Sequence, residues 1–205
     1  MPLYPAEMND NDHTPDQRRS AVHLLAISTL LFFGIGGLLL IRFVQERDPV
    51  AVILGDRPLL QVPIGIAAGL LIGAVAWAFV SLKMMSAVRQ KYARLIGPFL
   101  IARHHRIWLS ICAGFGEEIF FRGAIQHWFG ILITAIFFVA IHGYLDPRNW
   151  RISIYGVLMT GGMVLLGILA EKFGLVAPMI AHAVIDIMLF ERLHLDWKRS
   201  NTAQS

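Results

Sequence analysis

The sequence predicts an all-α fold: a polytopic membrane bundle of about six transmembrane helices, with one basic helix at the membrane interface. Of the 205 residues, 56% are hydrophobic and only 16% are charged, whereas soluble domains carry about 25% charged residues. The charges gather in short clusters and leave long uncharged stretches, which is the pattern of membrane proteins. A stretch that spans the bilayer must be a helix, because lipid offers no partner for free backbone groups.

The N-terminal part contributes a polar tail and two spans. Residues 1–20 are polar and contain three prolines, a composition typical of a disordered tail. Residues 21–41 form an uncharged run that is too long for a signal-peptide core, so we expect it to be retained. Residues 58–82 form the second span. Glycines recur in it every four residues and predict a face for close helix packing: Gly65, Gly69 and Gly73.

Residues 83–106 are basic and amphipathic. Apolar side chains recur at helical spacing, and the opposite face carries Lys83, Arg89, Lys91 and Arg94. This pattern suits a helix that lies in the headgroup region. The Gly97-Pro98 pair is expected to break or kink it. We predict that this segment anchors the protein at the membrane interface, with a regulatory or partner-binding role as the alternative. The segment ends the predicted N-terminal region, residues 21–106.

Apolar character then returns and predicts a four-helix core over residues 107–192, followed by a polar tail, 193–205. The expected helices lie at about 105–125, 128–144, 152–171 and 175–192, with interruptions at Gly130, Asp146-Pro147-Arg148 and Gly174. Cytoplasmic loops are enriched in Lys and Arg, so we place the basic segment in the cytoplasm, and six spans then put both termini there. A re-entrant arrangement of the short third and fourth helices would change the count.

Charge and cysteine content exclude two classes of protein. Basic residues flanking the spans explain the formal net charge of +4. No basic patch with interleaved aromatic residues stands apart from the span ends, which argues against a nucleic-acid partner. Cys112 is the single cysteine, so a disulfide framework is excluded.

The first group of ionisable residues at membrane depth is Glu117, Glu118 and Arg122. A charge there costs at least about 2.5 kcal/mol. On a helix Glu118 and Arg122 share a face and can pair, whereas Glu117 is rotated by about 100° and lacks this partner. Arg122 would then hold Glu118 ionised and leave Glu117 free to take up a proton near neutral pH. The plainer alternative is a solvated Glu117 at an interface.

Two further groups contain histidine. His142 closes an apolar helix that also holds Phe138, and taken alone it reads as a capped or interfacial residue. His182 and Asp186 are four residues apart and face the same way. They form either a functional pair or a pair that only locks helix packing. Together with the glutamates, these groups indicate a water-using catalyst, a metal site or a proton path.

These residues resemble the CPBP family of intramembrane endopeptidases, also described as Abi or CAAX-protease-like. The family pattern is EExxxR, then FxxxH, then HxxxN or a close variant, on separate membrane helices. Here the motifs read Glu117-Glu118-x-x-x-Arg122, Phe138-x-x-x-His142 and His182-x-x-x-Asp186. They keep this order within residues 115–190, about a third of the chain.

The resemblance implies a catalytic role for each residue. Glu117 would be the general base that activates water, aided by His142. Glu118 and Arg122 would support and orient it, and His182 would stabilise the oxyanion. These roles match what peptide hydrolysis needs: a base near the water, and donors aimed at the developing negative charge.

Asp186 stands where a strict match to the family pattern has Asn. An ionised aspartate cannot donate a hydrogen bond to an oxyanion. Asp186 is therefore either protonated or a partner that orients His182, and we favour the second role.

The sequence does not decide whether the mechanism uses a metal ion. Glu117, His142 and His182 could bind a divalent ion such as zinc and leave one position open for water. The HExxH spacing of helical zinc peptidases is absent. We favour the glutamate-dependent mechanism without a metal.

The predicted function is hydrolysis of a peptide bond in a membrane-associated protein or peptide, by an intramembrane endopeptidase of the prokaryotic cytoplasmic membrane. One alternative is a non-catalytic membrane scaffold or partner-binding relative of the family. Another is a proton-coupled transporter, although no inverted repeat or pair of broken helices supports it. The substrate, the cleavage site and the oligomeric state stay open.

Overall fold

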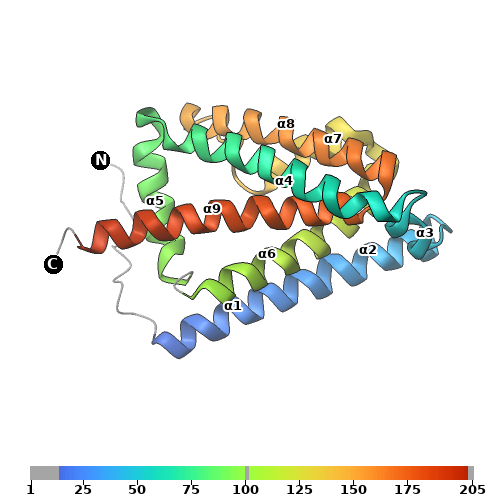
Figure 1. The fold of residues 1–205 in the computed structure, drawn as a ribbon, viewed down its shortest axis with the longest axis horizontal. Helices are drawn as coiled ribbons and strands as arrows, with labels where there is room; N and C mark the ends of the chain where they lie inside the picture. The colour runs from blue at the N-terminus through green and yellow to red at the C-terminus, as the bar shows by residue number, and fades with distance from the viewer. Residues whose placement is uncertain (1–13, 100–101, 203–205) are drawn as a thin grey trace.

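The computed structural model describes residues 14–99 and 102–202, and every secondary-structure element in these ranges is helical. The all-α prediction is therefore confirmed. The long helices run side by side along the molecule, and α5 lies across one end of them (Figure 1). Most of the predicted N-terminal tail, residues 1–13, lies outside the described residues, as do residues 203–205 of the C-terminal tail.

The first helical stretch begins earlier than predicted. It consists of α1 (Pro15–Thr29), a π-helical turn (Leu30–Ile35), α2 (Gly36–Leu39) and a second π-helical turn (Leu40–Val44). Thr14 and Gln17 form a capping box at its start, which stabilises a helix in polar sequence that hydropathy alone assigns to the tail. The short helix α3 (Pro49–Leu54) follows and is capped by Asp48.

The second stretch is α4 (Pro58–Ser81), and its glycines pack against α9 (Val176–Thr202). A Cβ atom added to Gly65 would lie 2.6 Å from the Ala177 carbonyl oxygen, and one added to Gly69 would lie 2.7 Å from the Ala181 carbonyl oxygen. These distances leave no room for a side chain. The predicted close-packing face is thus confirmed.

The basic segment folds into a 3₁₀ turn (Lys83–Met85), α5 (Ser86–Ile96) and a second 3₁₀ turn (Gly97–Phe99), so the helix breaks at the predicted Gly97-Pro98 pair. An ion pair ties α5 to α9: Arg89 Nε lies 2.9 Å from Asp196 Oδ2.

The C-terminal core begins with α6 (Arg103–Glu118), a π-helical segment (Ile119–Ile125) and α7 (Gln126–Ile141). The helix does not end near residue 125 as predicted, but the predicted interruption at Gly130 is confirmed: its φ of 70° and ψ of 175° are non-helical. The core ends with α8 (Trp150–Phe173) and α9, which runs on through the predicted polar tail to Thr202.

Four helical stretches among the described residues are long and apolar enough to cross a membrane: Asp16–Val44, Pro58–Ser81, Arg103–Ile141 and Trp150–Phe173. The structure thus supports an integral membrane protein with four such stretches rather than the predicted six. The predicted third and fourth spans fall within one stretch of 39 residues. The predicted sixth span corresponds to α9, which carries three charged residues near its middle: Asp186, Glu191 and Arg192.

Candidate active site

A buried ionic cluster joins α6 to α9. Glu118 Oε1 lies 3.0 Å from Arg122 Nη1 and 2.8 Å from His182 Nδ1. The Glu118 and Arg122 side chains are 0% and 1% exposed. The predicted pairing of Glu118 with Arg122 is confirmed, and it forms across the start of the π-helical segment that follows α6. Such local π-helical geometry occurs frequently at functional sites.

Glu117 points to a different partner, as its rotation on the helix predicts. Its Oε2 lies 3.6 Å from His142 Nε2, and it has no hydrogen-bond partner among the described residues. The Glu117 side chain is 12% exposed, and that of His142 is 33% exposed. This separation is longer than a direct hydrogen bond, so each atom can bind a water molecule placed beside the pair.

The ring of His142 is held by a backbone carbonyl. Its Nδ1 lies 2.7 Å from the Phe138 carbonyl oxygen, which can only accept a hydrogen bond. The hydrogen therefore sits on Nδ1, and in a neutral ring Nε2 presents its lone pair toward Glu117.

From its sequence position alone, Phe138 is expected only to pack in the core. In the structure its ring also contacts residues of the site. The guanidinium carbon of Arg122 lies 4.6 Å from the centre of the Phe138 ring. The same ring stacks on His142, with centroids 4.3 Å apart, and meets His182 edge-on at 5.7 Å. One aromatic side chain thus contacts three of the predicted site residues.

Asp186 lies beside His182, with Oδ2 3.7 Å from His182 Nε2. The two ring nitrogens of His182 therefore face two carboxylates, Glu118 and Asp186. The structure brings all six predicted site residues into one neighbourhood. Glu117 and His142 form one part of it, and the other part contains Glu118, Arg122, His182 and Asp186.

The predicted metal set is not assembled around a common centre. Among the described residues, no group of three His, Cys, Asp or Glu side chains is placed to hold a metal ion. His182 Nδ1 is hydrogen-bonded to Glu118, and its Nε2 lies 3.7 Å from Asp186 Oδ2. This donor arrangement does not fit a metal bound by Glu117, His142 and His182.

The sequence analysis missed Met163 and Tyr144. The Met163 sulfur lies 3.0 Å from Arg122 Nη2, but nothing distinguishes this methionine from the other apolar residues of α8. Tyr144 stacks on His142 with ring centroids 6.3 Å apart. Its only sequence signal is its position two residues after that histidine.

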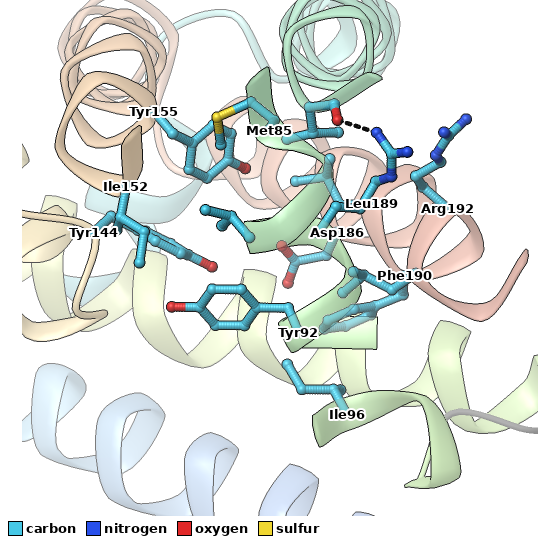
Figure 2. A pocket seen from close by; sticks show the side chains of 14 residues that line it. Met85, Tyr92, Ile96, Tyr144, Ile152, Tyr155, Asp186, Leu189, Phe190 and Arg192 are labelled. Carbon is cyan, nitrogen blue, oxygen red and sulfur yellow. Dashed lines mark hydrogen bonds between the residues drawn. The ribbon is translucent and has the colours of Figure 1, made fainter. Parts of the chain in front are cut away.

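Two cavities each include one residue of the cluster in their walls. A cavity of about 110 Å³ is lined mainly by apolar and aromatic side chains, and Asp186 forms part of its wall. Figure 2 shows this carboxylate among the rings of Tyr92, Tyr144 and Tyr155. A second cavity, of about 460 Å³, is lined by Arg122 together with polar residues that include Arg47, Asp56 and Lys172.

Tyr92 and Tyr144 lie outside the four apolar stretches. Burial raises the pKa of both phenols, and the negative charges of Asp146 and Asp186 raise the pKa of Tyr92 and Tyr144 respectively. Both hydroxyls are therefore protonated at neutral pH and can donate hydrogen bonds.

Residues 98–188 match the family model of the Type II CAAX prenyl endopeptidases, Rce1-like. The predicted resemblance to this family is confirmed over these residues. The Rce1-like match includes all three motifs and every residue of the cluster described above. It covers the C-terminal core, and the first two apolar stretches lie before it.

A protein of Bacillus subtilis (strain 168), described as the uncharacterized protein YpbD, is 37% identical to this chain over 84 residues. The aligned part covers 40% of this chain, and the chain spans 42% of the length of that relative. No solved structure matches the chain significantly. Similarity to the Rce1-like family thus rests on the core that contains the cluster.

Proposed function

We propose that this protein is an intramembrane endopeptidase that hydrolyses a peptide bond of a membrane-associated protein or peptide. The observation that carries the proposal is the pair of Glu117 Oε2 and His142 Nε2, 3.6 Å apart and next to a buried ionic cluster. Burial of so many ionisable groups at membrane depth is costly and needs a function to justify it. The Rce1-like match over the same residues supports a peptidase.

In the proposed mechanism, a water held between Glu117 and His142 attacks the scissile carbonyl carbon. Glu117 accepts a proton from this water as the oxygen–carbon bond forms. Breakdown of the tetrahedral intermediate cleaves the carbon–nitrogen bond, and Glu117 returns the proton to the leaving amine nitrogen. His142 orients the water, and its own ring is fixed by the Phe138 carbonyl.

His182 supplies the proposed donor to the oxyanion. Its Nδ1 hydrogen is directed at Glu118, so only Nε2 can donate to the substrate, and the ring must carry both hydrogens to do so. Two carboxylates beside the ring, Glu118 and Asp186, favour that form. Asp186 then orients His182 and does not itself contact the oxyanion.

We further propose that the chain crosses the membrane six times, with both termini and α5 in the cytoplasm. α1 begins and α9 ends at the end of the bundle where α5 lies (Figure 1). Both α6 and α8 run away from that end (Figure 1), so the chain must return between them, through α7 after Gly130 and the segment 142–149. The basic residues of α5 favour the cytoplasmic side, in a prokaryotic cytoplasmic membrane.

Cleavage of synthetic single-span peptides in proteoliposomes tests the proposal. Each peptide carries a fluorophore and a quencher on the two sides of the span. Replacing the general base should lower turnover about 10²–10⁴-fold, so Glu117→Gln is expected to be nearly inactive. The matched control is Glu46→Gln, the same change at an exposed residue, which should cleave like the wild type. Equal cleavage by wild type and Glu117→Gln would contradict the proposed site.

A further inference from the structure

The larger of the two cavities is not used by the proposed mechanism. Its volume is about 460 Å³, and its wall comes from α3, from the last residues of α8 and from the first residues of α7. It shares no lining residue with the cavity beside Asp186. α3 lies at the end of the bundle opposite α5 (Figure 1), so this cavity lies at the end of the molecule that is farthest from the basic helix.

The cavity lies where three apolar stretches end. The stretch Asp16–Val44 ends just before Arg47, the stretch Pro58–Ser81 begins just after Asp56, and the stretch Trp150–Phe173 ends within the cavity wall. Trp128, next to the lining residue His127, is exposed, and tryptophan is enriched at the interface between membrane and water. The cavity is therefore at the level of the lipid headgroups, which border the hydrocarbon layer.

Hydrogen bonds hold the wall of the cavity in place. The backbone nitrogen of Leu175 donates to the Ile53 carbonyl oxygen at 3.0 Å and joins the segment before α9 to α3. Gln45 Nε2 donates to the Ala124 carbonyl oxygen at 2.9 Å and holds the loop that carries Arg47. A preformed wall lowers the entropy cost of binding a ligand.

Side chains of both charge signs line the cavity. Arg47 and Lys172 are cations, and Asp56 and Glu171 are carboxylates. Within the described part of the chain, the side chains of Lys172 and Asp56 have no hydrogen bond or ion pair. These two charges are therefore free to bind a ligand. A ligand that carries only negative charge would meet the two carboxylates, whereas a ligand with both charge signs can pair with all four groups.

Arg122 adds a buried donor to the wall. Its side chain is 1% exposed, and Glu118 Oε1 lies 3.0 Å from its Nη1, yet Nη1 has no hydrogen-bond partner among the described residues. Its Nη2 contacts the sulfur of Met163, which is a weak acceptor. A buried donor without an acceptor is costly, so an acceptor oxygen in the cavity would stabilise this side chain.

We propose that this cavity binds a phosphate ester that also carries a primary ammonium group, which is the chemistry of a phosphoethanolamine headgroup. The phosphate oxygens accept hydrogen bonds from Arg47, Arg122 and Lys172, and the ammonium donates to Asp56 and Glu171. An apolar cavity of about 150 Å³ holds benzene, and this headgroup is only a few atoms larger, so the cavity has room for it and for bridging waters. The inference goes beyond the proposed peptidase function and does not depend on it.

Lipid binding to the purified full-length protein in detergent tests the inference, with native mass spectrometry as the measurement. The probes are phosphatidylethanolamine, phosphatidylglycerol and phosphatidylcholine with identical acyl chains. Phosphatidylglycerol lacks the amine, and the quaternary amine of phosphatidylcholine has no hydrogen to donate. A hydrogen bond to a charged group is worth about tenfold or more in affinity. The wild type should therefore bind phosphatidylethanolamine at least about tenfold more tightly than the other two lipids.

Two variants assign the preference to the cavity. Lys172→Gln should weaken binding of phosphatidylethanolamine about tenfold or more, and Asp56→Asn should remove most of the preference over phosphatidylglycerol. Both residues are exposed, and a thermal unfolding temperature measured without lipid verifies that each variant is folded. Lys91→Gln on α5 is the matched control and should bind like the wild type. Equal affinity of the wild type for all three lipids, or an unchanged preference in both variants, overturns the inference.

A competition distinguishes a membrane lipid from a soluble ligand of the same chemistry. Glycerophosphoethanolamine carries the same headgroup without acyl chains. Displacement of phosphatidylethanolamine only at a much higher concentration supports a membrane lipid as the occupant. Displacement at an equal concentration supports a soluble phosphate ester in the same site. No displacement up to the solubility limit shows that the acyl chains alone hold the lipid, and it overturns the inference.

Discussion

Glu118 Oε1 lies within 3.0 Å of both Arg122 Nη1 and His182 Nδ1, so a single buried carboxylate oxygen connects α6 to α9. The adjacent Glu117 has a looser contact, at 3.6 Å from His142. The neighbouring glutamates thus differ in their contacts: Glu118 links two helices, and Glu117 is the general base of the proposed mechanism.

The two glutamates should therefore differ in their effect on stability. Removing one partner of a buried ion pair costs about 3–5 kcal/mol, because the other charge is left uncompensated. Glu118→Ala should lower the thermal unfolding temperature of the protein in detergent markedly, whereas Glu117→Ala should lower it much less while abolishing cleavage. Equal losses of stability in both variants would contradict the division of roles.

Asp186 permits a test of its orienting role. Asn is similar in shape and keeps a side-chain oxygen facing His182 Nε2, but it lacks the negative charge. We expect Asp186→Asn to keep kcat/KM within about tenfold of the wild type and Asp186→Ala to lose more. If both variants are as active as the wild type, Asp186 does not position His182.

The glycine face of α4 predicts a steric effect. A Cβ atom at Gly69 would lie 2.7 Å from both the Ala181 carbonyl oxygen and the Val184 Cβ atom. Gly69→Ala should therefore push α4 away from α9 and destabilise the protein by about 1–3 kcal/mol. Gly161→Ala on α8 is the control, since nothing lies within 4 Å of its added Cβ atom. Thermal unfolding in detergent compares the two, and a neutral Gly69→Ala would refute the packing argument.

Chelation tests the glutamate-dependent mechanism. Among the described residues, Glu117, His142 and His182 are not placed around a common centre that could hold a metal ion. Cleavage in proteoliposomes should continue after dialysis against a strong chelator. Loss of cleavage that zinc restores would assign ligand roles to Glu117 and His142 instead.

Helical periodicity explains which features of the site were predictable. Spacing of four residues correctly paired Glu118 with Arg122 and placed Asp186 beside His182. It carries no information on contacts between helices, so the bond from Glu118 to His182 and the sulfur of Met163 near Arg122 appear only in the structure.

The span boundaries were predicted less well because hydropathy does not report local hydrogen bonding. The capping box of Thr14 extends α1 into polar sequence. The helix predicted to end at about residue 125 continues through π-helical turns, and only the predicted interruption at Gly130, where φ is positive, breaks it.

That break at Gly130 also acts as a depth marker. A backbone with φ of 70° cannot continue the helical hydrogen bonds. We infer that Gly130, which is exposed, lies at the aqueous boundary of the bilayer, where water satisfies the free backbone groups. Glu117 precedes it by 13 residues, which is at most about 20 Å along the helix, because the π-helical segment between them rises less per residue. In a hydrocarbon layer of about 30 Å, the carboxylate then lies at least about 10 Å from the opposite boundary, and the proposed peptidase would cut its substrate inside the hydrocarbon layer rather than at either surface.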